Sequence, residues 1–196
     1  MAVLVGVSGA HGTGKSTVLQ HLLNLKLDDV VIDDFSVPRS VQSEYGMPLA
    51  EIVADPARVP EYQNRIAARK TERLRELRTL HGSDNKLIFA DRTPIDFYAY
   101  ARTWVGTHNQ YRDWLHDYHM QCAKDMLEYD LILLIPPRKF PFVEELQRGS
   151  KDTQALNHSY CMDFVRTFGA NKVKLIRRLQ VAARAEEFLQ YARQLQ

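Results

Sequence analysis

Residues 9–16 read GAHGTGKS, and this stretch decides the fold. It matches the pattern GxxxxGK[ST], in which a glycine-rich turn wraps its backbone N–H groups around phosphate at the start of a helix. The pattern is credible when a buried strand precedes it and a helix follows. Here VLVGV at residues 3–7 has the apolar character of such a strand, and STVLQHLL at residues 16–23 has that of the helix. The stretch therefore predicts a phosphate-binding loop, or P-loop.

Each residue type in this loop has a chemical reason. The glycines let the backbone curl into a nest for an anion at the positive end of a helix. Lys15 is expected to reach the β- and γ-phosphates of ATP, and the hydroxyl of Ser16 is expected to bind Mg²⁺. Thr17 is expected to begin the helix proper. The candidate ATP-binding residues are Gly9, Gly12, Thr13, Gly14, Lys15, Ser16 and Thr17.

Outward from the loop, five short apolar runs alternate with longer helical patterns. A short continuous apolar run is typical of a strand buried on both faces, and strands joined by helices predict a parallel sheet. We therefore expect an α/β fold, a P-loop NTPase three-layer sandwich with a five-stranded parallel sheet. The expected strands are 2–7, 30–32, 86–90, 131–135 and 172–176, and the expected helices are 15–27, 61–81, 94–105, 110–129, 153–168 and 181–196.

Two segments, 35–60 and 136–152, fall outside this alternation and are expected to be irregular. Long irregular segments inside a compact domain often form lids or binding loops. Residues 137–152 are expected to form a mobile lid, because their arginines and lysines can stabilise charge on a transferring phosphoryl group. A solvent-exposed basic loop is the alternative for each of these cations.

Composition limits the class of protein. The length of 196 residues fits one domain, 1–196, and 45% hydrophobic residues suffice for a sizeable core. A net charge of +2 is too small to predict nucleic-acid or membrane binding. Cys122 and Cys161 fit neither a disulfide framework nor a zinc site. No apolar run approaches the roughly 20 residues of a spanning helix, and the first residues lack the basic stretch of a signal peptide. A cytoplasmic protein is expected.

A second group of polar residues follows the third expected strand. Asp91 and Arg92 come directly after the apolar run LIFA, and ligands bind at the carboxyl ends of strands in open α/β sheets. A carboxylate there suits the second protein contact to Mg²⁺, so Ser16 and Asp91 are the expected metal-binding residues. Arg92 is suited to hold an anionic acceptor. Residues 93–96 read TPID, which predicts a capped helix start.

Three segments, GAHGTGKS, DRTPIDFYAYA and YDLILLIPPRKFPFVEELQR, together resemble P-loop nucleoside and nucleotide kinases. The resemblance covers residues 3 to about 168 and is strongest to NadR-like kinases and viral deoxynucleoside monophosphate kinases of AAA type. Asp91 and Arg92, with AY at residues 99–100, are also similar to thymidylate kinases, where the Asp–Arg pair serves metal and acceptor phosphate. The resemblance implies ATP and Mg²⁺ as cofactors, and Arg148 as a lid arginine. A viral origin would imply the host cytoplasm.

The acceptor site is expected between the end of the second strand and the tip formed by Asp91 and Arg92. A phosphate acceptor needs nearby cations, whereas a hydroxyl acceptor needs a carboxylate that can take up its proton. The segment VIDDFSVPRS at residues 31–40 contains both carboxylates and a cation, so it is compatible with a phosphate acceptor and with a hydroxyl acceptor. Most of the aromatic residues after this tip are expected in the core, and Tyr98 or Tyr100 is the candidate to flank the acceptor base. The candidate acceptor-binding residues are Asp33, Asp34, Phe35, Arg39, Arg92 and Tyr98.

The expected helix 61–81 is rich in arginine and lysine. A solvated, ion-paired helix is the favoured interpretation. The alternative is that Arg65 or Arg69 faces an acceptor phosphate, or that the basic stripe contacts DNA.

Together these patterns predict an ATP- and Mg²⁺-dependent kinase whose partner is a nucleotide-like small molecule, with a (deoxy)nucleoside monophosphate as the favoured acceptor. The alternatives are a kinase of a hydroxyl acceptor (a nucleoside, nicotinamide riboside or a hydroxymethylated base in DNA) and a non-kinase ATPase or switch. DNA is the less favoured partner, no membrane partner is expected, and a homodimer stays open. The candidate catalytic residues are Lys15, Asp91, Arg92 and Arg148.

Overall fold

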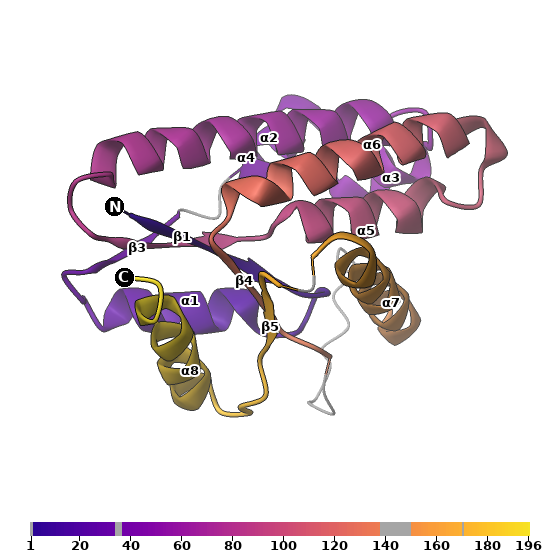
Figure 1. Cartoon of the computed structure of the whole chain (residues 1–196). Coiled ribbons are helices and arrows are strands. Elements are labelled where there is room, and N and C mark those ends of the chain that lie inside the picture. Colours follow the sequence, from indigo (N-terminus) through magenta and orange to yellow (C-terminus); the bar gives the residue numbers. More distant parts are fainter. Residues whose placement is uncertain (1, 34–36, 138–149, 170) are drawn as a thin grey trace.

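The computed structural model describes residues 2–33, 37–137, 150–169 and 171–196. Within these residues, five parallel strands form one sheet in the order β2-β3-β1-β4-β5 (Figure 1). The strand that leads into the P-loop, β1, therefore lies at the centre of the sheet. The strands are β1 (Val3–Ser8), β2 (Val30–Ile32), β3 (Leu87–Asp91), β4 (Leu131–Leu134) and β5 (Val173–Leu175).

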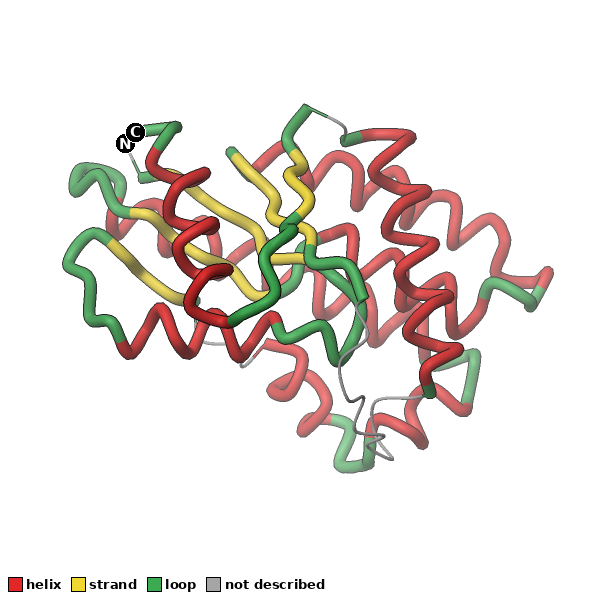
Figure 2. Tube along the Cα trace, turned by 90° about the horizontal axis from the view of Figure 1, so that it is seen from below, coloured by secondary structure: helices red, strands yellow, loops and turns green. Residues whose placement is uncertain are grey.

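Helices cover both faces of the sheet, so the molecule has three layers (Figure 1). One layer contains α1 and α8, and the opposite layer contains the helices from α2 to α7. Seen from below in Figure 2, the strands lie side by side behind α8, and the other helical layer extends beyond the sheet. The helices are α1 (Lys15–Asn24), α2 (Val37–Glu44), α3 (Leu49–Ala54), α4 (Val59–His81), α5 (Pro94–Val105), α6 (Arg112–Asp125), α7 (Lys151–Phe168) and α8 (Val181–Arg193), with 3-10 turns η1 (Asn109–Tyr111) and η2 (Met126–Glu128).

The core has two halves because successive side chains of a strand point to opposite faces of the sheet. In β1, Leu4 packs toward α4 and α5, whereas Val5 packs toward α1 and α8. Both side chains are fully buried, and burial of such a side chain stabilises the fold by about 1.5–3 kcal/mol. Since both faces need apolar residues, the strands read as continuous apolar runs rather than as alternating ones.

The structure confirms the predicted fold and gives each expected strand and helix a counterpart. The prediction that residues 35–60 are irregular is wrong, because α2 and α3 lie there. These helices are eight and six residues long, with one buried residue each, Val41 in α2 and Ile52 in α3, and such short segments hold too few apolar positions to establish a period. The first helix begins at Lys15, in agreement with the expected range 15–27, so Thr17 lies within the helix and does not begin it.

The predicted lid falls mostly outside the described residues, which end at 137 and resume at 150. Its last two residues, Lys151 and Asp152, are helical and begin α7.

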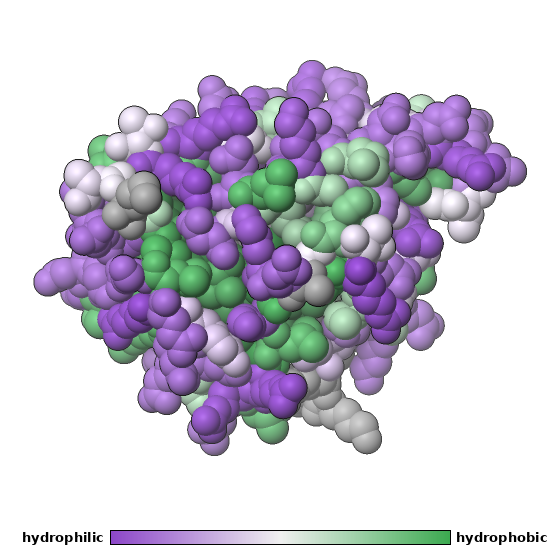
Figure 3. All heavy atoms as spheres, viewed as in Figure 1, coloured by the Kyte–Doolittle hydropathy of each residue, from purple (hydrophilic) through white to green (hydrophobic). Residues whose placement is uncertain are grey.

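On the face shown in Figure 3, apolar residues gather in the middle, between the helices above and below the sheet, and polar residues cover those helices. Of the helices in the described part of the chain, none combines the length and the apolar character that crossing a bilayer requires.

Candidate functional site

The P-loop joins β1 to α1 at the carboxyl edge of the sheet. Three of its glycines, Gly9, Gly12 and Gly14, have positive φ. Gly9 has φ +144°, and a Cβ atom there would lie 2.5 Å from the carbonyl oxygen of Ile135. Gly14 has φ +87° and precedes α1 without a side-chain cap, so no capping side chain competes with an anion for the first amides of the helix. This local geometry is that of an anion-binding turn.

Lys15 is buried over this loop, with 7% of its surface exposed. Its ammonium group donates hydrogen bonds to the carbonyl oxygens of Gly9 and Ala10, the second at 3.0 Å. Thr13 donates from its hydroxyl to the same Ala10 oxygen at 2.9 Å. Because phosphate oxygens carry charge and these carbonyls do not, a phosphate would bind the ammonium group more strongly than its present partners do.

Ser16 and Asp91 lie together, as the sequence predicts. The Ser16 hydroxyl donates to Oδ2 of Asp91 at 3.2 Å. The other oxygen, Oδ1, is buried and has no hydrogen-bond partner among the described residues. A hydroxyl and a carboxylate with an unused oxygen are the hard ligands that Mg²⁺ prefers. The described residues contain no cluster of three or more His, Cys, Asp or Glu side chains that would bind a metal ion by themselves.

Asp96 connects the P-loop to the start of α5. It is 1% exposed, and its Oδ1 accepts a hydrogen bond from the amide of Gly9 at 2.9 Å. Its Oδ2 accepts from the amide of Thr93 at 2.9 Å, while the Thr93 hydroxyl accepts from the amide of Ile95 at 3.2 Å. The predicted capping of α5 is therefore present, and the second contact, to the P-loop, is one that the sequence does not signal.

Two further side chains contact the outside of the P-loop. Gln154 on α7 donates from Nε2 to the carbonyl oxygen of His11 at 2.6 Å. Arg184 on α8 donates from Nη1 to the carbonyl oxygen of Thr13 at 2.9 Å. Three separate helices, α5, α7 and α8, thus hold the backbone of the loop, and no motif in the sequence marks these partners.

Arg92 lies at the tip of β3 next to the Ser16–Asp91 pair. Its backbone has φ +65°, and its guanidinium carbon lies 4.8 Å from the ring centroid of Tyr100. Burial opposes its charge, but the neighbouring Tyr100, Asp91 and Asp96 outweigh that effect and raise its pKa. The structure therefore holds a permanent cation beside the predicted metal-binding residues.

Tyr98, the other predicted aromatic residue, lies elsewhere. Its ring stacks on His119 at a centroid distance of 3.9 Å and packs against Phe164 at 5.5 Å. It is 6% exposed, and burial raises its pKa. Tyr98 is thus part of the aromatic core between α5, α6 and α7, and Tyr100 is the residue that contacts Arg92.

Asp33, at the end of β2, forms a buried ion pair with Lys70 of α4. The two side chains are 1% and 4% exposed, and Nε of Arg73 lies 3.5 Å from Oδ1 of Asp33. The expectation that the basic residues of this helix are solvated is therefore wrong for Lys70. Arg39 is exposed on α2. The candidates Asp34, Phe35 and Arg148 lie outside the described residues.

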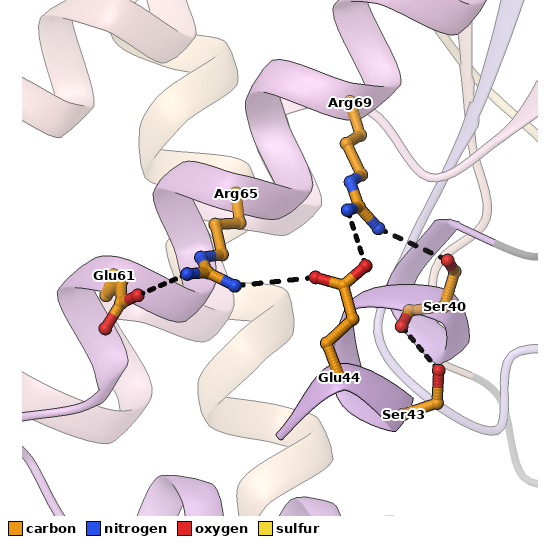
Figure 4. Close-up of polar contacts among 6 residues, drawn as sticks. All are labelled: Ser40, Ser43, Glu44, Glu61, Arg65 and Arg69. Atoms are coloured by element: carbon orange, nitrogen blue, oxygen red, sulfur yellow. Dashed lines mark hydrogen bonds and ion pairs between the residues drawn. The ribbon is translucent and has the colours of Figure 1, made fainter. Parts of the chain in front are cut away.

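Arg65 and Arg69 of α4 both pair with Glu44 of α2 (Figure 4). The contact from Arg69 is 2.5 Å long and that from Arg65 is 3.4 Å, and Arg65 also pairs with Glu61 at 2.8 Å. Arg69 donates to the hydroxyl of Ser40 at 3.2 Å. These half-exposed pairs, worth about 0–1 kcal/mol each, agree with the ion-paired helix favoured from sequence.

Comparison with known proteins adds the family to this geometry. No match was found among curated protein sequences. Solved structures with the same fold include the NadR protein in complex with NR, thymidylate kinase from Candida albicans and deoxyadenosine kinase from M. mycoides with the products dCMP and dCDP. Their TM-scores are 0.71, 0.66 and 0.64, at sequence identities of 16%, 13% and 14%.

The extent of these similarities differs. The NadR match covers 97% of this chain and 51% of the NadR chain, so this chain spans about half the length of that protein. The thymidylate kinase match covers 99% of this chain and 92% of the thymidylate kinase chain. The deoxyadenosine kinase match covers 98% of this chain and 100% of the deoxyadenosine kinase chain. Over residues 4–184 the sequence matches the AAA domain family, and the chain belongs to that family as a P-loop protein with the fold of nucleoside and nucleotide kinases.

Proposed function

We propose that this protein transfers the γ-phosphoryl group of ATP to a nucleotide-like acceptor, with a (deoxy)nucleoside monophosphate as the favoured acceptor. The observation that carries the proposal is the convergence of Lys15 on the P-loop, the Ser16–Asp91 pair and Arg92 at one edge of the sheet. Phosphoryl transfer is catalysed mainly by positioning and by stabilisation of charge, and these groups suit both tasks.

On the donor side, the amides of the P-loop and Lys15 bind the β- and γ-phosphates. Lys15 exchanges its contacts to Gly9 and Ala10 for phosphate oxygens. Ser16 and Asp91 are the residues that would hold Mg²⁺, which when bound neutralises charge on the phosphates. The proposal includes residues 1–196 as one domain, with Arg148 in a lid over residues 137–152.

On the acceptor side, the described carboxylates favour a phosphate over a hydroxyl. A hydroxyl acceptor needs a base for its proton, whereas a monophosphate oxygen is already anionic. Asp33 is paired with Lys70, and the unused oxygen of Asp91 is assigned to Mg²⁺, so in this proposal neither carboxylate serves as that base. Arg92 offers the cation that an acceptor phosphate needs.

A hydroxyl acceptor is the second candidate. It is supported by the fold shared with NadR in complex with NR and with deoxyadenosine kinase. Asp33 at the end of β2 would be its carboxylate, since Oδ1 accepts no hydrogen bond from the described residues, although Arg73 lies 3.5 Å away.

A panel of acceptors tests the proposal. The protein is incubated with ATP, Mg²⁺ and each deoxynucleoside monophosphate, each nucleoside or nicotinamide riboside, and ADP release and the phosphorylated product are both measured. The proposal expects a diphosphate product from at least one monophosphate. A phosphorylated nucleoside alone would support the second candidate, and ADP release independent of every acceptor would overturn both.

Two variants make the panel specific to the site. Lys15→Ala should abolish turnover while the protein stays folded, because it removes the cation on the transferred phosphate. Lys124→Ala, which removes an exposed lysine on α6, is the matched control and should keep full activity. Near-normal turnover in Lys15→Ala would contradict the mechanism.

A further inference from the structure

We propose that Arg184 on α8 is a positioning residue of the P-loop, because it fixes the peptide unit between Thr13 and Gly14 so that the Gly14 amide faces the nucleotide phosphates. The inference rests on the proposed nucleotide binding and adds a residue that no part of the motif contains.

Arg184 is a buried cation with two backbone partners. It is 3% exposed, although a charge is expensive to bury unless it is hydrogen-bonded. Its Nη1 donates to the carbonyl oxygen of Thr13 and its Nε to that of Arg178, both at 2.9 Å. The guanidinium group therefore joins the P-loop to the segment after β5.

The contact to Thr13 sets the direction of the next amide. The carbonyl of Thr13 and the N–H of Gly14 belong to one planar trans peptide, in which the two groups point in opposite directions. Since Arg184 binds the carbonyl oxygen from the side of α8, the Gly14 N–H points away from α8 and toward the inside of the loop. A charged donor on the carbonyl also polarises the peptide and makes that N–H a better donor.

Gly14 fits this arrangement closely. Its φ of +87° is unfavourable for other residues, and a Cβ atom there would lie 3.1 Å from Nη1 of Arg184. The glycine of the motif thus serves two purposes at this position, the turn of the backbone and the close approach of the guanidinium group.

A second residue of α8, Glu187, makes it possible to test the P-loop contact of Arg184 separately from the contacts that α8 makes with the segment after β5. The carboxylate of Glu187 accepts hydrogen bonds from the amides of Arg177 and Arg178, at 3.3 Å and 3.1 Å. Arg184 and Glu187 therefore both hold the segment after β5. Of the two, only Arg184 also contacts the P-loop among the described residues. Glu187→Ala, which removes this acceptor, is for this reason a matched control.

The test measures binding of ADP with Mg²⁺ by isothermal titration calorimetry, at a temperature where each variant is folded. Arg184→Met should raise the Kd for ADP by about tenfold or more, because a misoriented amide loses a charge-assisted phosphate contact. Arg184→Lys, which keeps one donor, should lie between this variant and the wild type. Glu187→Ala should stay within about twofold of the wild type.

Kinetics give a readout that a purely structural role would not move. Arg184→Met should raise the KM for ATP and leave the KM for the acceptor unchanged, because the disturbed peptide is on the donor side. Methylguanidinium, added at concentrations that leave the wild type unaffected, should partly restore ADP binding to Arg184→Ala. If Arg184→Met does not fold, Arg184→Lys and the rescued Arg184→Ala decide the question in the same way.

Two results would overturn the proposal. One is wild-type ADP affinity in Arg184→Met or Arg184→Lys, and the other is an equal loss in Glu187→Ala, which would trace the effect to the segment after β5. Both leave the proposed kinase activity standing. A wild-type protein that binds no ADP would instead overturn the proposed function and this role together.

Discussion

The carboxylate of Asp96 accepts a hydrogen bond from the amide of Gly9, 87 positions earlier in the chain, at 2.9 Å. Its second oxygen caps α5 through Thr93. One buried side chain thus sets both the beginning of the P-loop and the beginning of the helix that follows Arg92. The donor and acceptor sides of the proposed site are connected through this residue.

Replacing Asp96 should therefore destabilise the protein. Asp96→Ala leaves the amides of Gly9 and Thr93 buried without acceptors, which should lower the free energy of unfolding by about 3 kcal/mol. Urea denaturation measures the change. Asp152→Ala is the control, because Asp152 is an exposed acid in the first turn of α7 and should contribute less than about 1 kcal/mol. Equal effects of the two variants would contradict the assigned role of Asp96.

The buried pair of Lys70 and Asp33 gives a second prediction. Lys70→Met leaves the buried carboxylate of Asp33 with the half-exposed Arg73, 3.5 Å away, as its remaining cation partner, and the free energy of unfolding should fall by about 3 kcal/mol. The double variant Asp33→Asn with Lys70→Met should recover much of this loss, because no buried charge remains. Arg75→Met, which removes an exposed arginine of the same helix, should change the value by less than about 0.5 kcal/mol. A double variant no more stable than Lys70→Met would exclude charge burial as the cause.

The Ser16–Asp91 pair predicts a defect in the use of metal. Asp91→Asn keeps the shape of the side chain and removes its charge, so kcat should fall by about 10²-fold or more and the Mg²⁺ concentration for half-maximal activity should rise. Steady-state kinetics over a Mg²⁺ titration measure both values. Asp113→Asn, an exposed change on α6, should alter neither. Unchanged Mg²⁺ dependence in Asp91→Asn would remove Asp91 from the metal site.

Stability should also fall in mild acid. Burial, with the charges of Arg102 and His116, lowers the pKa of His119 below its ordinary value of 6.5, and burial lowers that of His158. The unfolded chain therefore takes up protons at a higher pH than the folded protein does. The stability contributed by these neutral histidines is complete above about pH 7 and is lost as the pH falls through the range below 6.5.

The variant His119→Phe tests this dependence. It keeps an aromatic ring against Tyr98 and cannot be protonated, so the free energy of unfolding should fall less steeply between about pH 7 and pH 5 than in the wild type. Urea unfolding at several pH values gives the slope. The same slope in both proteins would show that His119 does not titrate differently on folding.

The fold was predictable wherever the signal is local. The apolar strands and the motif of residues 9–16 lie in continuous segments, and because parallel strands end at one edge, Ser16 and Asp91 were expected at the same edge of the sheet. The order of the strands is not local, and sequence reasoning did not supply it. The short helices α2 and α3 were missed because eight and six residues are too few to establish a period.

The missed parts of the site have a common cause. Tyr98 and Tyr100 are two residues apart on a helix, hence about 200° apart around its axis, and only the packing of α5 decides which of them meets Arg92. Lys70 and Arg184 resemble the other cations of their helices in sequence, although both are buried. A charged residue reveals its burial only through partners that come from distant parts of the chain.

The outer contacts of the P-loop have a consequence for how the protein acquires its ligand. The partners of Gly9, His11 and Thr13 lie 87, 143 and 171 positions further along the chain. Contacts of such long range form late, after the cost of closing large chain segments has been met. Affinity for ADP should therefore arise only once α8 has docked. The time at which ADP binding appears during refolding would then report when this last step of folding occurs.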